Sequence, residues 1–135
     1  MHKLVKQYLD KCGGCHYFAF RLLVGLMFFL HGGQKLFGWF SDGPLPLVSL
    51  MGLAGIIELV AGAAIAMGIF TRLMALFSGV TMLVAYFMMH ASQGLNPLVN
   101  KGELALLYLA AFLVMIAMGN GKWSIEKTLL KKEIF

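Results

Sequence analysis

Apolar and polar positions divide the chain into four long hydrophobic stretches joined by short polar segments. The stretches cover residues 17–37, 47–70, 73–89 and 103–118. Their lengths lie near the roughly 20 residues that a helix needs to cross a bilayer. Glycine and proline interrupt the pattern between stretches, for example at Asn96-Pro97. The pattern predicts an all-α integral membrane protein, built as a bundle of four transmembrane helices.

The two ends of the chain have a different, amphipathic pattern. In residues 1–16, apolar side chains repeat at helical spacing among lysines, which is typical of a short helix lying on a membrane surface. In the basic tail 119–135, Ser124 is a candidate N-cap for a second interfacial helix. We therefore expect an N-terminal segment 1–16, a transmembrane domain 17–118 and a C-terminal tail 119–135.

Composition supports a membrane protein and excludes an ordinary soluble domain. Of the 135 residues, 60% are hydrophobic and 13% are charged, and the mean hydropathy is +0.82. A soluble domain of this size could not bury so much apolar surface, because small domains expose a large share of their residues.

The basic residues predict an orientation. The formal net charge is +5. Most Lys and Arg residues flank one side of the predicted bundle, whereas Lys35 and Lys101 flank the other. Basic residues collect on the cytoplasmic side, so both termini are expected there, facing anionic lipid. Their position beside the spans argues against nucleic acid as a partner. The first group contains Lys3, Lys6, Lys11, Arg21, Arg72, Lys122, Lys127, Lys131 and Lys132.

Several ionisable residues fall in the outer half of the predicted spans. Glu58 lies roughly 16 Å below the outer end of its helix, close to the bilayer midplane. His31 and Lys35 are four residues apart on one helix face, while His90 and Glu103 lie near the outer surface. Ionisable groups in lipid are costly and need a partner or a purpose. We expect Glu58 to pair with His31.

Helical spacing indicates which faces point inward. Gly55 and Gly62 share a stripe with Glu58, and small residues let helices approach closely. Glu58 is therefore expected to face another helix instead of lipid. On the third span, Tyr86 and His90 share a face, so the phenol is expected to join the same cluster.

This cluster has more than one interpretation. A buried Glu–His pair can simply fix the register of the helices. It can instead line a pocket for a quinone, a small sulfur species, a haem or a metal, or form a proton path. A resident metal is less favoured because the ligands differ in depth and the Glu-x-x-His motif is absent, so no metal ligand set is predicted.

A second candidate for chemistry is the run Cys12-Gly13-Gly14-Cys15-His16. It matches the pattern for covalent haem attachment, but the basic residues place it on the cytoplasmic side, where that attachment does not occur. A redox-active dithiol, half of a metal site completed by a partner, and two incidental thiols remain open for Cys12 and Cys15.

Five segments in order resemble the DoxX family of membrane proteins, over roughly residues 18–128. They include His31-Gly32-Gly33-Gln34-Lys35-Leu36-Phe37-Gly38 and Gly55-Ile56-Ile57-Glu58-Leu59-Val60-Ala61-Gly62. The others are Gly68-Ile69-Phe70-Thr71-Arg72, Lys101-Gly102-Glu103-Leu104-Ala105-Leu106 and Gly119-Asn120-Gly121-Lys122-Trp123-Ser124. The chain departs from the family pattern at Asn120, where Pro is frequent, and at Glu126, where Asp is usual.

The resemblance implies a four-span protein of the bacterial inner membrane. Relatives are linked to membrane oxidoreductase complexes, including thiosulfate:quinone oxidoreductase, with soluble or membrane redox partners. The hypothesis is a redox subunit in which Glu58, His31 and Lys35 act catalytically. Substrate contacts are assigned to Gln34, Tyr86, His90 and Glu103. A quinone is the favoured cofactor, ahead of haem or metal. A non-catalytic anchor for redox partners, and a small transporter formed by a homo-oligomer, are the alternatives.

Overall fold

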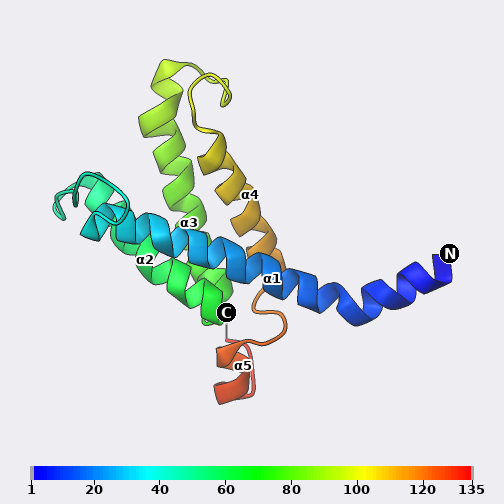
Figure 1. The fold of residues 1–135 in the computed structure, drawn as a ribbon. Coiled ribbons are helices and arrows are strands. Elements are labelled where there is room, and N and C mark those ends of the chain that lie inside the picture. Colours follow the sequence, from blue (N-terminus) through cyan, green and yellow to red (C-terminus); the bar gives the residue numbers. More distant parts are fainter. Residues whose placement is uncertain (1, 135) are drawn as a thin grey trace.

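The structure, a computed structural model, describes residues 2–134, and their regular elements are all helical (Figure 1). The five α-helices are α1 (His2–Phe37), α2 (Leu50–Met67), α3 (Thr71–Ala85), α4 (Glu103–Met118) and α5 (Ile125–Leu130). A π-helix, η1 (Tyr86–His90), and a short 3₁₀ helix, η2 (Ala91–Gln93), extend α3.

The long helices form two hairpins that diverge from a shared turn. α1 packs along α2, α3 packs along α4, and the tight turn at residues 68–70 joins the hairpins (Figure 1). We call the halves of the helices beside the connections 38–49 and 91–102 the loop end. The opposite halves, beside the α2–α3 turn and α5, are called the terminal end.

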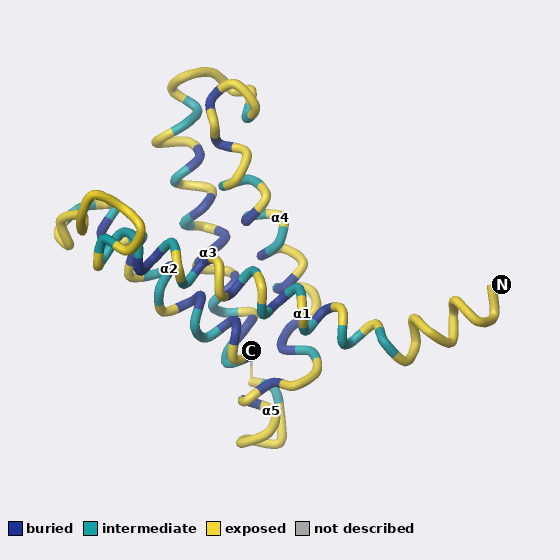
Figure 2. Tube along the Cα trace, in the orientation of Figure 1, coloured by how far each residue is buried: buried dark blue, intermediate teal, exposed yellow. Residues whose placement is uncertain are grey.

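The first helix is longer than the sequence predicts. Residues 1–16 were expected to form a separate surface helix, but α1 runs unbroken from His2 to Phe37. Its 36 residues span about 54 Å, more than the roughly 30 Å of a hydrocarbon core. No proline interrupts this stretch, so helix propagation through Gly13 and Gly14 has no steric obstacle. The first turns project beyond the bundle and are exposed (Figure 2).

Glycines bring α1 and α2 into backbone contact. A Cβ atom added to Gly25 would lie 2.6 Å from the backbone nitrogen of Ala66. Gly32 and Gly62 likewise meet the backbone of the opposite helix. Such close approach of small residues is a main source of helix association in lipid.

Cap residues determine where α2 begins and ends, whereas α3 passes directly into a π-helix. Ser49 caps α2, because its hydroxyl accepts a hydrogen bond from Gly52 N at 3.0 Å. Gly68 ends it in the left-handed region, with φ 70°. The third predicted span, 73–89, changes character within its length, since α3 is α-helical only to Ala85 and continues as η1 to His90. α4 covers the same residues as the fourth predicted span.

The outer surface is apolar and the core is small. Three helical segments are long and apolar enough to cross a membrane, namely His2–Phe37, Leu50–Met67 and Thr71–Gln93, and α4 is a shorter apolar helix. Large aliphatic side chains such as Leu107 are exposed on the outside, whereas Phe28, Ile65 and Phe112 form the buried core. This distribution is consistent with a small multi-pass helical bundle in lipid.

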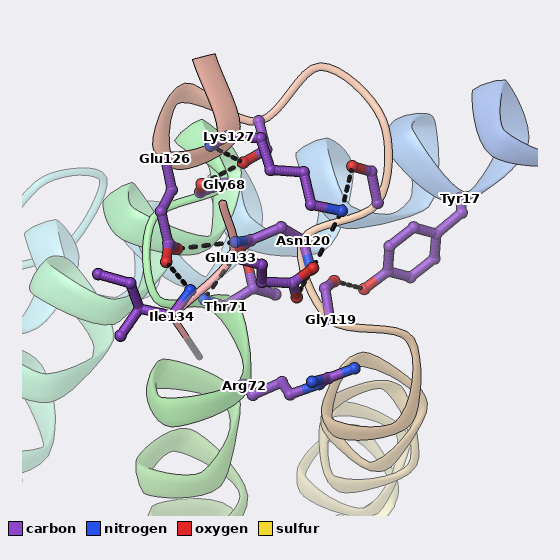
Figure 3. A network of polar contacts seen from close by, with 12 residues as sticks. Tyr17, Gly68, Thr71, Arg72, Gly119, Asn120, Glu126, Lys127, Glu133 and Ile134 are labelled. Atoms are coloured by element: carbon purple, nitrogen blue, oxygen red, sulfur yellow. Dashed lines mark hydrogen bonds and ion pairs between the residues drawn. The ribbon is translucent and has the colours of Figure 1, made fainter. Parts of the chain in front are cut away.

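The C-terminal tail is fastened to the bundle instead of standing apart from it (Figure 3). Ser124 caps α5 as predicted, accepting from Lys127 N at 3.1 Å, but its hydroxyl also donates to Gly68 O at 3.0 Å. The carboxylate of Glu126, which is buried, accepts hydrogen bonds from Phe70 N and from the amide of Asn120. α5, which the sequence predicts as an interfacial helix, is therefore held against the α2–α3 turn, and we call this attachment the clamp of the tail.

α1 joins the same network through two buried side chains. Arg21 is fully buried and donates to the carbonyl oxygens of Asn120 and Trp123. Tyr17 donates its hydroxyl to Gly119 O, at the end of α4. A guanidinium suits this place, because the carboxyl ends of α2 and α4 both carry partial negative charge.

Candidate functional site

A cavity of about 510 Å³ lies between the two hairpins at the loop end. This volume is within the usual range for small-molecule sites. All four long helices contribute to its wall, which combines apolar side chains with a cluster of polar groups. The polar lining residues are His31, Lys35, Glu58, His90, Gln93, Asn100, Lys101 and Tyr108.

The central feature of the cavity is an ion pair between α1 and α2. Lys35 Nζ donates to Glu58 Oε1, and the Glu58 side chain is 2% exposed. Gly55 makes room for this contact, since a Cβ atom there would lie 3.0 Å from Lys35 Cβ. The Lys35 side chain therefore passes over Gly55 and reaches inward from near the end of α1.

His31 does not form the predicted pair with Glu58. Its ring lies edge-on to the ring of Tyr108 on α4, with 5.8 Å between centroids and an interplanar angle of 84°. The expectation was wrong about the partner because it considered depth alone. A lysine four residues further along has a long flexible side chain that reaches the same carboxylate.

Two polar atoms in the cavity wall have unused hydrogen-bonding capacity. Glu58 Oε2 and the hydroxyl of Tyr108 are buried, and neither has a hydrogen-bond partner within residues 2–134. Leaving a buried polar atom without a partner costs about 1–3 kcal/mol. Groups in this state at the wall of a cavity suit the binding of a ligand that supplies the missing donors and acceptors.

The π-helix η1 and the following loop position His90. Its Nδ1 lies 2.9 Å from Asn100 O, a hydrogen bond that leaves Nε2 available. The Asn100 side chain, itself buried, donates to Gly94 O at 2.7 Å and accepts from Gly102 N at 2.8 Å. Asn100 thus closes the loop 94–102 and holds His90 at the cavity. π-helical turns often occur at functional sites.

Three predicted substrate contacts lie away from the cavity wall. Tyr86 does not join the Glu58 cluster; its hydroxyl donates to Leu95 O at 2.7 Å, and its ring packs beneath Gly102. Gln34 is partly buried on α1, and Glu103 is exposed at the start of α4. Each is close to the cavity in sequence, but helical rotation turns it away.

The sequence did not predict that Tyr108 and Asn100 line the cavity. Tyr108 carries the single hydroxyl in the apolar stretch 104–118, and a lone polar group in such a stretch is a usable signal. Asn100 falls in a loop whose polar residues all look equivalent in sequence, so nothing marked it in advance.

The cysteine pair lies far from this cavity along α1. Cys12 and Cys15 are partly buried, and their sulfurs are not bonded to each other. The His16 ring contacts Cys12 O at 2.9 Å through Nδ1. Within residues 2–134, no three His, Cys, Asp or Glu side chains gather closely enough to hold a metal ion.

Apolar helices around a polar cavity define the class: a small multi-pass membrane protein. The DoxX family model matches residues 16–91, which is more than half of the chain. The chain belongs to the DoxX family, and the resemblance read from the sequence is confirmed.

Two curated relatives are similar over most of their length. An uncharacterized protein of Haemophilus influenzae is 35% identical over 129 residues, covering 87% of this chain and 93% of the relative. The inner membrane protein YqjF of Escherichia coli is 30% identical over 121 residues, covering 83% and 90% respectively. The chain is accordingly a multi-pass inner-membrane protein. No solved structure matches it.

Proposed function

We propose that this protein is the membrane subunit of a redox complex, and that the loop-end cavity binds the head of a quinone or a small sulfur substrate. The observation that carries the proposal is a pair of buried polar atoms in one cavity, Glu58 Oε2 and the Tyr108 hydroxyl, which have no hydrogen-bond partner among residues 2–134. A purely structural ion pair would not require the second carboxylate oxygen or the phenol to lack a partner.

The lining fits a quinone head chemically. Quinone oxygens accept hydrogen bonds, and the Tyr108 hydroxyl and Lys35 ammonium are donors, while the hydroxyl of the reduced quinol can donate to Glu58 Oε2. Phe28, Met82 and Leu104 supply apolar contacts for the ring. When bound, a quinone would supply the redox chemistry, taking up an electron pair and two protons. The electrons would come from a redox partner protein of the complex.

The residues of this chain would bind the head and manage protons. Tyr108 would donate a hydrogen bond to one oxygen, and His31, in contact with the Tyr108 ring, would orient the phenol. The Lys35–Glu58 pair would hold a proton between two basic atoms and could pass it to a bound oxygen. His90 Nε2 would connect the cavity to the loop surface.

We further infer four crossings with both termini in the cytoplasm. α4 is shorter than the other spans, about 24 Å by its 16 residues, but it returns the chain antiparallel to α3. Arg21, Arg72 and Lys122 lie at the terminal end, in agreement with the charge rule. The cavity would then open in the outer half of the membrane.

A non-catalytic anchor is the second candidate. It is favoured by the extent of the terminal-end network, which fastens three helices and the tail by hydrogen bonds. In that case the Lys35–Glu58 pair would fix the register of α1 against α2, and the bundle would carry soluble partners on its basic face.

The test is ligand binding by the purified full chain in mild detergent. Calorimetric titration with a short-chain quinone and with thiosulfate compares the wild type with Glu58→Gln and Tyr108→Phe. Each variant is expected to lose at least about tenfold in affinity, roughly 1.4 kcal/mol. Glu103→Gln is the matched control, because Glu103 is exposed and outside the cavity wall. Equal affinity in all four proteins, or no binding of either compound, would overturn the proposal in favour of the anchor.

A further inference from the structure

A second cavity lies on the opposite side of the seam between α2 and α3. Its volume is about 220 Å³, and it is lined by apolar side chains of α2, α3 and η1. Its lining includes Leu50, Leu53, Val80, Val84 and Met88, all of which are exposed at the bundle surface. In a membrane protein such a surface faces the acyl chains. The second cavity is therefore a lipid-facing pocket.

The two cavities share one wall. Met51, Ala54, Ala85 and Met89 line both of them, two residues from α2 and two from α3 and η1. The alanines leave little side-chain volume in the seam. The methionines are unbranched and change rotamer readily. Small and flexible side chains therefore separate the polar cavity from the lipid-facing pocket.

The geometry of the hairpins favours an opening at this place. α2 and α3 are tied together at the terminal end by the turn at residues 68–70, and they diverge toward the loop end (Figure 1). Met89 belongs to η1, whose π-helical backbone departs from the regular hydrogen-bonding of α3. The seam therefore lies at the diverging ends of α2 and α3, away from the turn that joins the two hairpins.

The polarity of the two cavities differs sharply. The first has Glu58 Oε2 and the Tyr108 hydroxyl, buried and unpartnered within residues 2–134. In the second, the one hydroxyl, that of Thr81, donates to Phe77 O in its own helix at 2.8 Å. The second pocket thus offers only apolar contact. A ligand that fills both would have a polar head and an apolar tail.

We propose that the ligand is a lipid with a polar head and a single flexible tail, of the isoprenoid quinone type, and that it enters sideways from the bilayer between α2 and α3. The head lies against Glu58 and Tyr108, and the tail passes between Ala54 and Ala85 into the second cavity. This inference rests on the proposed function, and it selects the quinone over the water-soluble sulfur substrate.

The experiment uses the full chain in detergent and two probes with the same benzoquinone head, one without a tail and one with a short isoprenoid tail. The wild type is expected to bind the tailed probe at least about tenfold more tightly. Ala85→Phe and Ala54→Leu, which fill the seam from either side, are expected to remove that advantage, so that the tailed and the tailless probe bind each variant with affinities within about twofold of each other.

Ala110→Phe is the matched control, because Ala110 is exposed on α4 and lines neither cavity. It is expected to retain the preference for the tailed probe. Thermal unfolding of each variant reports folding, and either seam variant alone suffices if the other does not fold.

The outcomes separate the two proposals. Binding of both probes with no preference for the tail, or a preference that survives both seam variants, overturns the lateral route while leaving the head site intact. Equal binding of a single-chain lipid that has the same tail but a phosphocholine head also overturns it, because the seam would then be a general lipid contact. Failure of both probes to bind would overturn the head site itself.

Discussion

The side-chain amide of Asn120 donates a hydrogen bond to Glu126 Oε2 over 2.7 Å, at the buried centre of the terminal end (Figure 3). These are the two positions at which the resemblance described above expects Pro and Asp instead. The amide oxygen of Asn120 accepts from Thr71 N, and Glu126 accepts from Phe70 N. The two departures are therefore one contact, and together they cap the start of α3.

Glu126→Ala is expected to lower stability by about 1–3 kcal/mol, because it leaves the Phe70 amide and the Asn120 side chain without this acceptor. Thermal unfolding in detergent, followed by circular dichroism, measures the change. Lys132→Ala provides the comparison, since Lys132 is exposed. Equal melting temperatures would mean that water replaces the carboxylate at no cost.

Arg21→Lys is expected to destabilise the bundle by about 2 kcal/mol. A lysine keeps the charge but cannot place two donors on the carbonyl oxygens of Asn120 and Trp123 at once. Urea-induced unfolding measures the loss. If Arg21→Lys matches the wild type while Arg21→Met is strongly destabilised, charge alone holds the tail, and the directional hydrogen bonds are unimportant.

Gly32→Ala is expected to cost about 1–3 kcal/mol, because its Cβ would strike the backbone of α2 at Leu59 and force α1 away. Gly13→Ala is the matched substitution in the same helix, where a Cβ meets nothing within 4 Å, and it should be neutral or slightly stabilising. Thermal unfolding distinguishes them. A result in which both behave alike would argue against backbone contact between α1 and α2.

Acid is expected to weaken the attachment of the tail through Glu133. Burial works to raise the pKa of Glu133, but the hydrogen bond from Asn120 N, the Lys127 ammonium and the nearby Arg72 guanidinium outweigh it, so the pKa lies below its ordinary value. A lowered folded-state pKa stabilises at pH above the unfolded-state value, and this stability is lost as pH falls through the folded-state pKa.

The melting temperature of the wild type should therefore drop more steeply below about pH 4.3 than that of Glu133→Gln, which lacks the titrating group. Melting curves at a series of pH values make the comparison. Parallel curves for the two proteins would show that Glu133 contributes nothing to the pH dependence.

The two native cysteines report the orientation of the chain. If both termini are cytoplasmic, a membrane-impermeant maleimide should label Cys12 and Cys15 in inverted inner-membrane vesicles and not in intact spheroplasts. A variant with both cysteines replaced by serine and Asp42→Cys in the exposed 38–49 loop should give the reverse pattern. Labelling of Cys12 from the outside would invert the proposed topology.

Hydropathy and spacing predicted much of this architecture. Four apolar stretches correspond to four helices, and the Gly55–Glu58–Gly62 stripe does face α1. His31, Lys35, Glu58 and His90, which the sequence placed in the outer half of the bundle, all line one cavity. These successes share a cause, since helical period determines which face a residue occupies and apolar length determines its depth.

The hydrogen-bond and ion-pair partners of these side chains were harder to predict than the helix face on which each side chain lies. Glu58 pairs with Lys35 and not with His31, because the long flexible side chain of a lysine carries its ammonium group well away from its own Cα. Arg21 counted in the sequence only as a positive charge, yet its acceptors are backbone carbonyls of the tail, which no pattern of side chains reveals. The predicted break between segment 1–16 and the first span is absent from the structure. Amphipathicity changes along α1, but no residue there stops a helix.

The clamp of the tail on the α2–α3 turn bears on how the protein is made. The acceptors for Phe70 N and Thr71 N are supplied by Glu126 and Asn120, about fifty residues later in the chain. During synthesis the ribosome exposes the turn long before it releases those residues. The nascent hairpins must therefore wait in the translocon or the bilayer with that turn incomplete, until residues 120–126 have left the ribosome and can pack against it.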